Sequence, residues 1–65
     1  MDLHIKRANK ITSKDWIFTS QDNTQVVVAH LVKEVAYRNN GNLLEITMED
    51  GKKLLTNPSE FLLSA

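Results

Sequence analysis

The chain has 65 residues, eight basic and eight acidic side chains, and no cysteine. A chain this short forms a single domain, residues 1–65, and buries only about 60% of its unfolded surface, so we expect self-association to add stability. The lack of cysteine excludes disulfide bonds, thiol catalysis and cysteine-ligated zinc, and it fits a cytoplasmic protein. The sequence has neither a secretory signal nor an apolar run of transmembrane length, so we expect no membrane partner.

Basic residues are concentrated at the start of the chain. Residues 1–14 contain Lys6, Arg7, Lys10 and Lys14 against the single acid Asp2, a balance of +3, and the remainder of the chain balances at −3. A basic start on a mildly acidic body is typical of an arm that binds nucleic acid. A solvated chain end gives the same pattern, so residues 1–10 are a candidate basic arm and both interpretations stay open.

Short apolar runs predict two strands in the first third of the chain. Leu3 and Ile5 alternate with polar neighbours, which is typical of a half-buried strand. Residues 16–19 are Trp-Ile-Phe-Thr, a composition that favours a pleated surface. The short polar side chains of residues 20–23 compete for local backbone hydrogen bonds and predict a turn.

Residues 24–38 fit two different structures. Apolar side chains three and four positions apart would form one stripe of a helix, which gives an α+β fold with a helix at residues 25–38 as the alternative. The five valines favour strands, because a branched side chain loses χ1 freedom in a helix. A single strand of this length would be unusually long, so we predict two strands with a kink near Ala29 and His30.

Two turns that contain glycine bracket the apolar run at residues 43–48. Residues 39–42 are Asn-Asn-Gly-Asn, and residues 49–52 are Glu-Asp-Gly-Lys. Asn-Gly and Asp-Gly steps between apolar runs are the strongest hairpin signals in a short stretch of sequence. The second half therefore predicts a three-stranded meander, in which residues 43–48 pair with residues 33–38 and with residues 52–56.

The end of the chain resembles the start of a helix. Asn57 can cap, Pro58 suits the first helical turn, and Glu60 follows the cap by three residues. These signals predict a short helix at residues 58–63 that docks on the sheet, because one or two turns are unstable alone in water. The expected fold is mostly β: a small antiparallel meander or open barrel of four or five strands with a short C-terminal helix.

No constellation of residues predicts catalysis. His4 and His30 lack a second ligand at helical spacing, so we expect no metal site. Glu49 and Asp50 lie at a turn beside lysines, where both stay ionised. No serine has a glycine-flanked elbow, and both glycines are used in turns. We therefore expect a protein that is not an enzyme, with no catalytic residue and no cofactor.

Two classes of binding function remain. The leading prediction is a small interaction or regulatory protein, a homo-oligomer or adaptor, because the chain has more apolar side chains than one thin sheet can cover. The alternative is a regulator that binds nucleic acid through phosphate contacts of its cations. The candidate contact residues for interaction are Leu43, Ile46, Leu54, Phe61 and Leu62, and those for nucleic acid are Lys6, Arg7, Lys10, Lys14 and Arg38.

Part of the chain resembles known bacterial proteins. Residues 32–35 (Val-Lys-Glu-Val), 42–46 (Asn-Leu-Leu-Glu-Ile) and 50–53 (Asp-Gly-Lys-Lys) are similar to the small flagellar-operon family called FlbD and to the opening hairpins of LytTR-type DNA-binding domains. The resemblance covers residues 26–55 and implies strands at residues 24–38. A LytTR-type domain would imply DNA contacts from loops, but no binding residue is carried over from either family. The resemblance implies a regulatory module.

Overall fold

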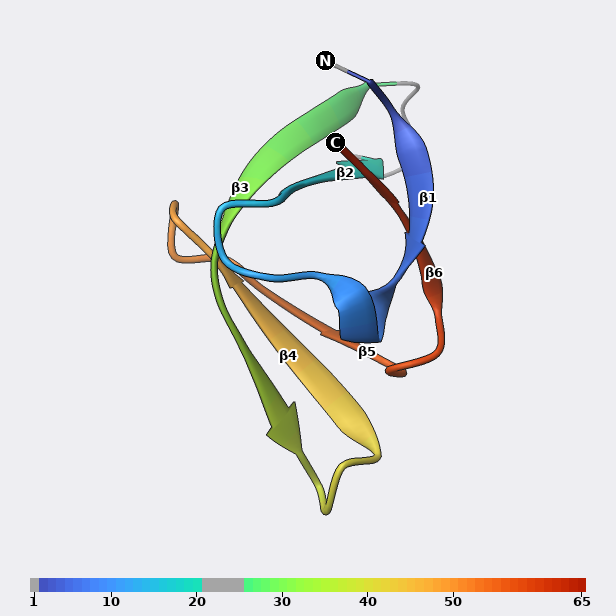
Figure 1. Cartoon of the computed structure of the whole chain (residues 1–65). Coiled ribbons are helices and arrows are strands. Elements are labelled where there is room, and N and C mark those ends of the chain that lie inside the picture. The colour runs from blue at the N-terminus through green and yellow to red at the C-terminus, as the bar shows by residue number, and fades with distance from the viewer. Residues whose placement is uncertain (1, 21–25) are drawn as a thin grey trace.

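The structure, a computed structural model, describes residues 2–20 and 26–65. Its strands form one antiparallel sheet in the order β1-β6-β2-β3-β4-β5, so β1 and β5 are the two edges (Figure 1). The strands are β1 His4–Arg7, β2 Trp16–Ser20, β3 Val27–Arg38, β4 Leu43–Met48, β5 Lys53–Thr56 and β6 Phe61–Ser64. The prediction of a mostly β fold is confirmed, with six strands in place of four or five. Within the described residues, the 3-10 turn η1 (Ala8–Lys10) is the one helical element, and no helix has the length and apolar character to cross a membrane.

Strand β3 connects the two halves of the sheet. Its first part pairs with β2 and its second part with β4, so its 12 residues form one strand instead of two. The register shifts between Val32 and Glu34, a few residues beyond the kink expected near Ala29 and His30. The alternative prediction of a helix at residues 25–38 is wrong, because Val27–Arg38 is a strand. Pairing with β2 and β4 satisfies its backbone hydrogen bonds, and branched valine side chains disfavour a helix.

The predicted meander is confirmed. Strands β3, β4 and β5 pair in sequence order, with Arg38 opposite Leu43. In the first turn, Asn39 and Asn40 have φ of 54° and 56°. The glycine of each turn also has a positive φ, 87° at Gly41 and 91° at Gly51. These are left-handed conformations, which glycine and asparagine adopt at least cost. The turn predicted at residues 20–23 lies outside the described residues except for Ser20.

The predicted C-terminal helix is wrong. The Asn57 side chain caps a turn instead, because its Oδ1 accepts the backbone N–H of Ser59 (2.9 Å) and the Ser59 hydroxyl (2.7 Å). The chain then continues as β6, which inserts between β1 and β2 and pairs with both. Two neighbouring strands give this short segment the backbone partners that one helical turn would lack. Ser64 at its end is fully buried and donates its hydroxyl to the carbonyl of Trp16 (2.8 Å).

The core lies on the inner side of the curved sheet. Alternation along β4 buries Leu44, Ile46 and Met48 and leaves the residues between them half-buried. The other buried apolar residues come from η1, the following loop, β2 and β3; they are Ala8, Ile11, Ile17 and Val32. The inner side is therefore filled by both halves of the sheet, and the side chains that point the other way cover the outer side.

Candidate functional site

One continuous set of side chains covers the outer side of β1, β6, β2 and the first part of β3. Directly paired residues of antiparallel strands point to the same side, as does every second residue along a strand. Phe18 links the set, because it is opposite Leu63 of β6 and opposite Ala29 of β3. We call this set the apolar face; its members are Ile5, Arg7, Trp16, Phe18, Ser20, Val27, Ala29, Leu31, Phe61 and Leu63.

The apolar face is exposed and contains almost no charge. Ile5 is 65% exposed, Val27 56% and Phe61 54%, and the other large side chains are half-buried by their neighbours. Its one charged member is Arg7, whose guanidinium lies over the Phe61 ring at 4.3 Å and donates to the Ser59 carbonyl (2.9 Å). The face has no lysine, aspartate or glutamate. This composition is similar to that of the centres of protein interfaces, which are rich in aromatic residues and arginine and poor in other charged residues.

The outer side of the second half of the sheet has the opposite character. Glu45 of β4 accepts from Arg38 Nε (2.7 Å) and pairs with Lys53 Nζ (3.1 Å), so three strands carry one charge network there. The Lys53 ammonium and the Arg38 guanidinium lower the pKa of the Glu45 carboxyl, against the desolvation that would raise it. Leu55 of β5, opposite Glu45, is also exposed, but here it lies beside this charge network, whereas the uncharged set on β1, β6, β2 and the start of β3 is continuous.

The five interaction residues predicted from the sequence lie in different places. Ile46 is fully buried in the core, and Leu54 and Leu62 pack against the core from its margin. Leu43 is half-buried at the start of β4. Phe61 alone belongs to the apolar face. The rest of that face was missed, because its members come from distant segments that only the position of β6 brings together.

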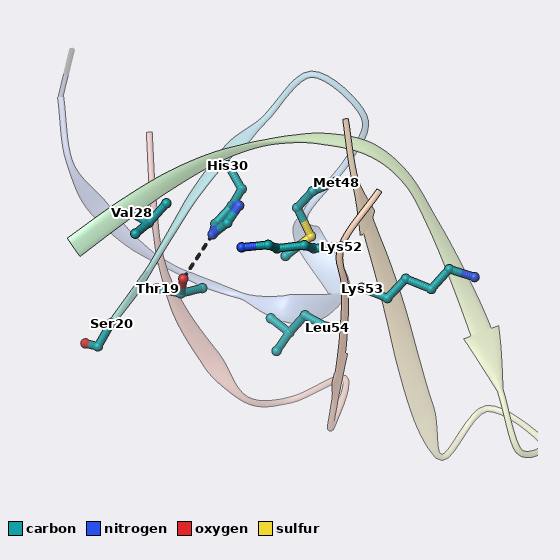
Figure 2. Close-up of a pocket in the computed structure, with 8 residues that line it drawn as sticks. All are labelled: Thr19, Ser20, Val28, His30, Met48, Lys52, Lys53 and Leu54. Carbon is teal, nitrogen blue, oxygen red and sulfur yellow. Dashed lines mark hydrogen bonds between the residues drawn. The ribbon is translucent and has the colours of Figure 1, made fainter. Parts of the chain in front are cut away.

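A pocket of about 380 Å³ lies between β2, the first part of β3 and β5 (Figure 2). Its polar lining consists of Thr19, Ser20, His30, Lys52 and Lys53. Its apolar lining consists of Val28, Met48 and Leu54. The volume falls in the range of sites for small molecules, about 300–1,000 Å³.

A chain of hydrogen bonds runs through the buried His30 ring. Thr19 Oγ1 lies 3.1 Å from His30 Nε2, and His30 Nδ1 lies 3.3 Å from Asp50 Oδ2. The backbone N–H of Lys52 (2.9 Å) and the His30 ring lower the pKa of the Asp50 carboxyl, against a smaller opposing contribution from desolvation. An ionised carboxylate only accepts, so Nδ1 carries the proton, and Nε2 of the neutral ring accepts from the Thr19 hydroxyl.

No local pattern in the sequence predicts this chain of hydrogen bonds. Thr19 and His30 are 11 residues apart and meet because β2 and β3 pair, whereas Asp50 arrives from the turn before β5. The contacts of both ring nitrogens, with the Thr19 hydroxyl and the Asp50 carboxylate, fix the orientation of the His30 ring. Among residues 2–20 and 26–65, no group of three or more His, Cys, Asp or Glu side chains could hold a metal ion.

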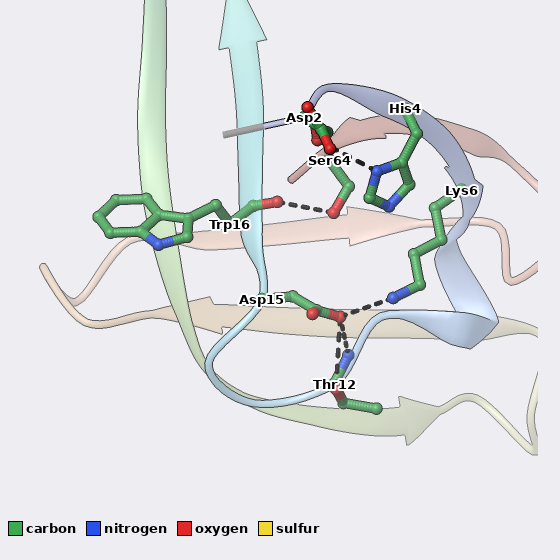
Figure 3. Close-up of polar contacts among 7 residues, drawn as sticks. All are labelled: Asp2, His4, Lys6, Thr12, Asp15, Trp16 and Ser64. Atoms are coloured by element: carbon green, nitrogen blue, oxygen red, sulfur yellow. Dashed lines mark hydrogen bonds and ion pairs between the residues drawn. The ribbon is translucent and has the colours of Figure 1, made fainter.

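The predicted nucleic-acid residues are largely occupied within the chain. Lys6 Nζ pairs with Asp15 Oδ2 at 3.1 Å, and the same carboxylate accepts the Thr12 backbone N–H at 2.9 Å (Figure 3). Desolvation opposes ionisation of Asp15, but the Thr12 N–H and the Lys6 ammonium outweigh it and lower the pKa of that carboxyl. Arg7 stacks on the Phe61 ring.

The remaining cations of that set are dispersed. Arg38 binds Glu45 in the second half of the sheet, at the far end of β3. Lys10 closes η1, and Lys14 lies in the loop before β2, where its backbone has φ of 74° and its N–H bonds to the Val32 carbonyl (2.8 Å). The part of the candidate arm at residues 4–10 forms β1 and η1, so the cations are mounted on folded elements.

Comparison with protein-family models, with curated proteins and with solved structures finds no match. The likeness to FlbD-like proteins and LytTR-type hairpins therefore stays a prediction from sequence.

Proposed function

We propose that this protein is a small, non-enzymatic interaction module that acts as a homo-oligomer, with the apolar face as the contact between copies. The observation that carries the proposal is the extent and composition of that face. Aromatic residues and arginine are enriched in the centres of protein interfaces, where lysine, aspartate and glutamate are depleted. Trp16, Phe18, Phe61 and Arg7 match this pattern on one side of the sheet.

The dimensions of the face support a second copy as its partner. Four strands about 4.8 Å apart, each about five residues long at 3.3 Å per residue, cover roughly 300 Å² in projection. A standard interface buries about 800 Å² per partner, so this face would form the apolar centre and its neighbours the rim. Two such faces would pack as a sandwich with sheets about 10 Å apart.

Small size supports the same proposal. A chain of 65 residues without disulfides has a limited core, and an intermolecular core would add to it. We also propose what the sequence predicted of its role and location: a regulatory protein or adaptor in the cytoplasm. Nucleic-acid binding is the weaker candidate, because Lys6 and Arg38 pair with carboxylates and Arg7 with an aromatic ring.

Sedimentation equilibrium over a wide range of protein concentration tests the proposal. We expect a mass that rises with concentration to twice the mass of one chain, and a mass of one chain at every concentration would refute it. Fluorescence anisotropy of labelled single-stranded and duplex oligonucleotides, at low and moderate salt, is the parallel test. Binding that weakens steeply with salt would replace the proposed function by its nucleic-acid alternative.

A further inference from the structure

The pocket beside β5 has a lining that favours an anion. Its eight residues include two lysines, one histidine and two hydroxyl groups, and they include no carboxylate. Two neighbouring acids are bound by other groups, since Asp50 lies behind the His30 ring and Glu45 pairs with Arg38 and Lys53, and Glu49 is not part of the lining. The lysine, histidine and hydroxyl groups therefore line the pocket, and no carboxylate lines it.

The two neighbouring lysines have different environments. Lys53 Nζ pairs with Glu45 at 3.1 Å, and in Figure 2 its side chain extends away from His30. The Lys52 side chain extends toward Thr19 and His30 in the same view. Its ammonium has no ion pair with the residues that the structure describes. The Asp50 carboxylate acts on Lys52 at longer range, but no ion pair among the described residues holds the ammonium, so Lys52 brings one positive charge to the pocket, which matches a monoanion.

The apolar wall of the pocket indicates which class of anion fits it. Val28, Met48 and Leu54 line the pocket with apolar side chains, so a ligand gains from an apolar body as well as from its charge. A free inorganic ion would leave this wall uncovered.

We propose that this pocket binds a small organic carboxylate. The carboxylate head lies against the Lys52 ammonium, near the Thr19 hydroxyl, and the hydrocarbon body lies against Val28, Met48 and Leu54. The site is on the inner side of the sheet and shares only Ser20, at the end of β2, with the apolar face on the outer side, so this binding does not depend on the proposed self-association.

Titration of the full chain with octanoate, followed by ¹⁵N-resolved NMR, tests the proposal, with 1-octanol as the uncharged probe of equal chain length. We expect octanoate to shift the amides of Thr19, His30 and Leu54 and to bind at least about tenfold more tightly than 1-octanol. Equal binding of the two probes, tighter binding of inorganic phosphate, or no binding of octanoate would each overturn it.

Two adjacent lysines provide a matched pair of variants. Lys52→Gln should weaken octanoate binding about tenfold or more, and Lys53→Gln should change it by less than about threefold, because Lys52 extends toward the site whereas Lys53 extends away from it and pairs with Glu45. Both residues are exposed at or beside β5, so both variants retain the core. Equal losses in the two lysine variants would contradict the assignment of Lys52.

Discussion

Replacement of Phe61 by glutamate should dissociate the oligomer without unfolding the chain. Phe61 is 54% exposed in the single chain, and a phenylalanine buries about 200 Å² in full, so about 110 Å² remains to be covered by a partner. At about 25 cal/mol per Å², that area contributes about 2.7 kcal/mol. A two-fold symmetric contact contains the residue twice, which gives about 5 kcal/mol, or a dissociation constant weaker by roughly 10³ to 10⁴.

The fold should survive this change. The Phe61 ring has no place in the core, and a carboxylate at this position would lie beside the Arg7 guanidinium that now covers the ring. Tyr37→Glu is the matched control, because Tyr37 is an aromatic residue of similar exposure, 57%, outside the apolar face. Sedimentation equilibrium, with circular dichroism to verify folding, measures the outcome. A folded Phe61→Glu chain that associates as the wild type does, or equal dissociation by Tyr37→Glu, would refute the reasoning.

Three further predictions concern stability, each measured by urea unfolding. Ile46→Ala removes fully buried core volume and should cost about 2–5 kcal/mol; a loss below about 1 kcal/mol would mean that Ile46 is not packed as described. Gly51→Ala should cost about 1–2 kcal/mol because φ is 91°, although a methyl group there meets no atom within 4 Å; an unchanged midpoint would contradict the turn geometry. The pKa of Asp15 is lowered in the folded chain by Thr12 and Lys6, so its contribution to stability is fully present above its unfolded pKa, near 3.9, and is lost as pH falls through the folded value. Asp15→Asn should therefore be less stable near neutral pH and lose less stability on acidification; parallel pH profiles would contradict this.

Local signals predicted the second half of the fold. The Asn-Gly and Asp-Gly turns need left-handed backbone at fixed positions, and the structure has it at Asn40, Gly41 and Gly51. A turn of this kind determines the pairing of its two flanking strands, so β3, β4 and β5 follow from residues close in sequence. The valine content of residues 24–38 predicted strands there, but as two strands with a kink. The structure has one strand, because β3 passes from its partner β2 to its partner β4 without interruption.

Non-local pairing explains what the sequence did not reveal. Residues 57–60 have the pattern of a helix start, but the Asn57 side chain can cap a turn equally well. Strand β6 then pairs with β1 and β2, which are more than 40 residues away in the chain. The apolar face exists only in that strand order. The contact of Thr19 with His30 likewise requires two paired strands, so a search for spacing along the chain could not find it.

The most direct test of the central proposal is a dilution series of the ¹⁵N-labelled wild-type chain by two-dimensional NMR. If the apolar face joins two copies, the amide resonances of Ile5, Phe18 and Phe61 should shift with protein concentration, and those of Glu45 and Lys53 should stay in place. Resonances of the apolar face that do not change with concentration, in a chain whose mass is that of one copy, would contradict the account.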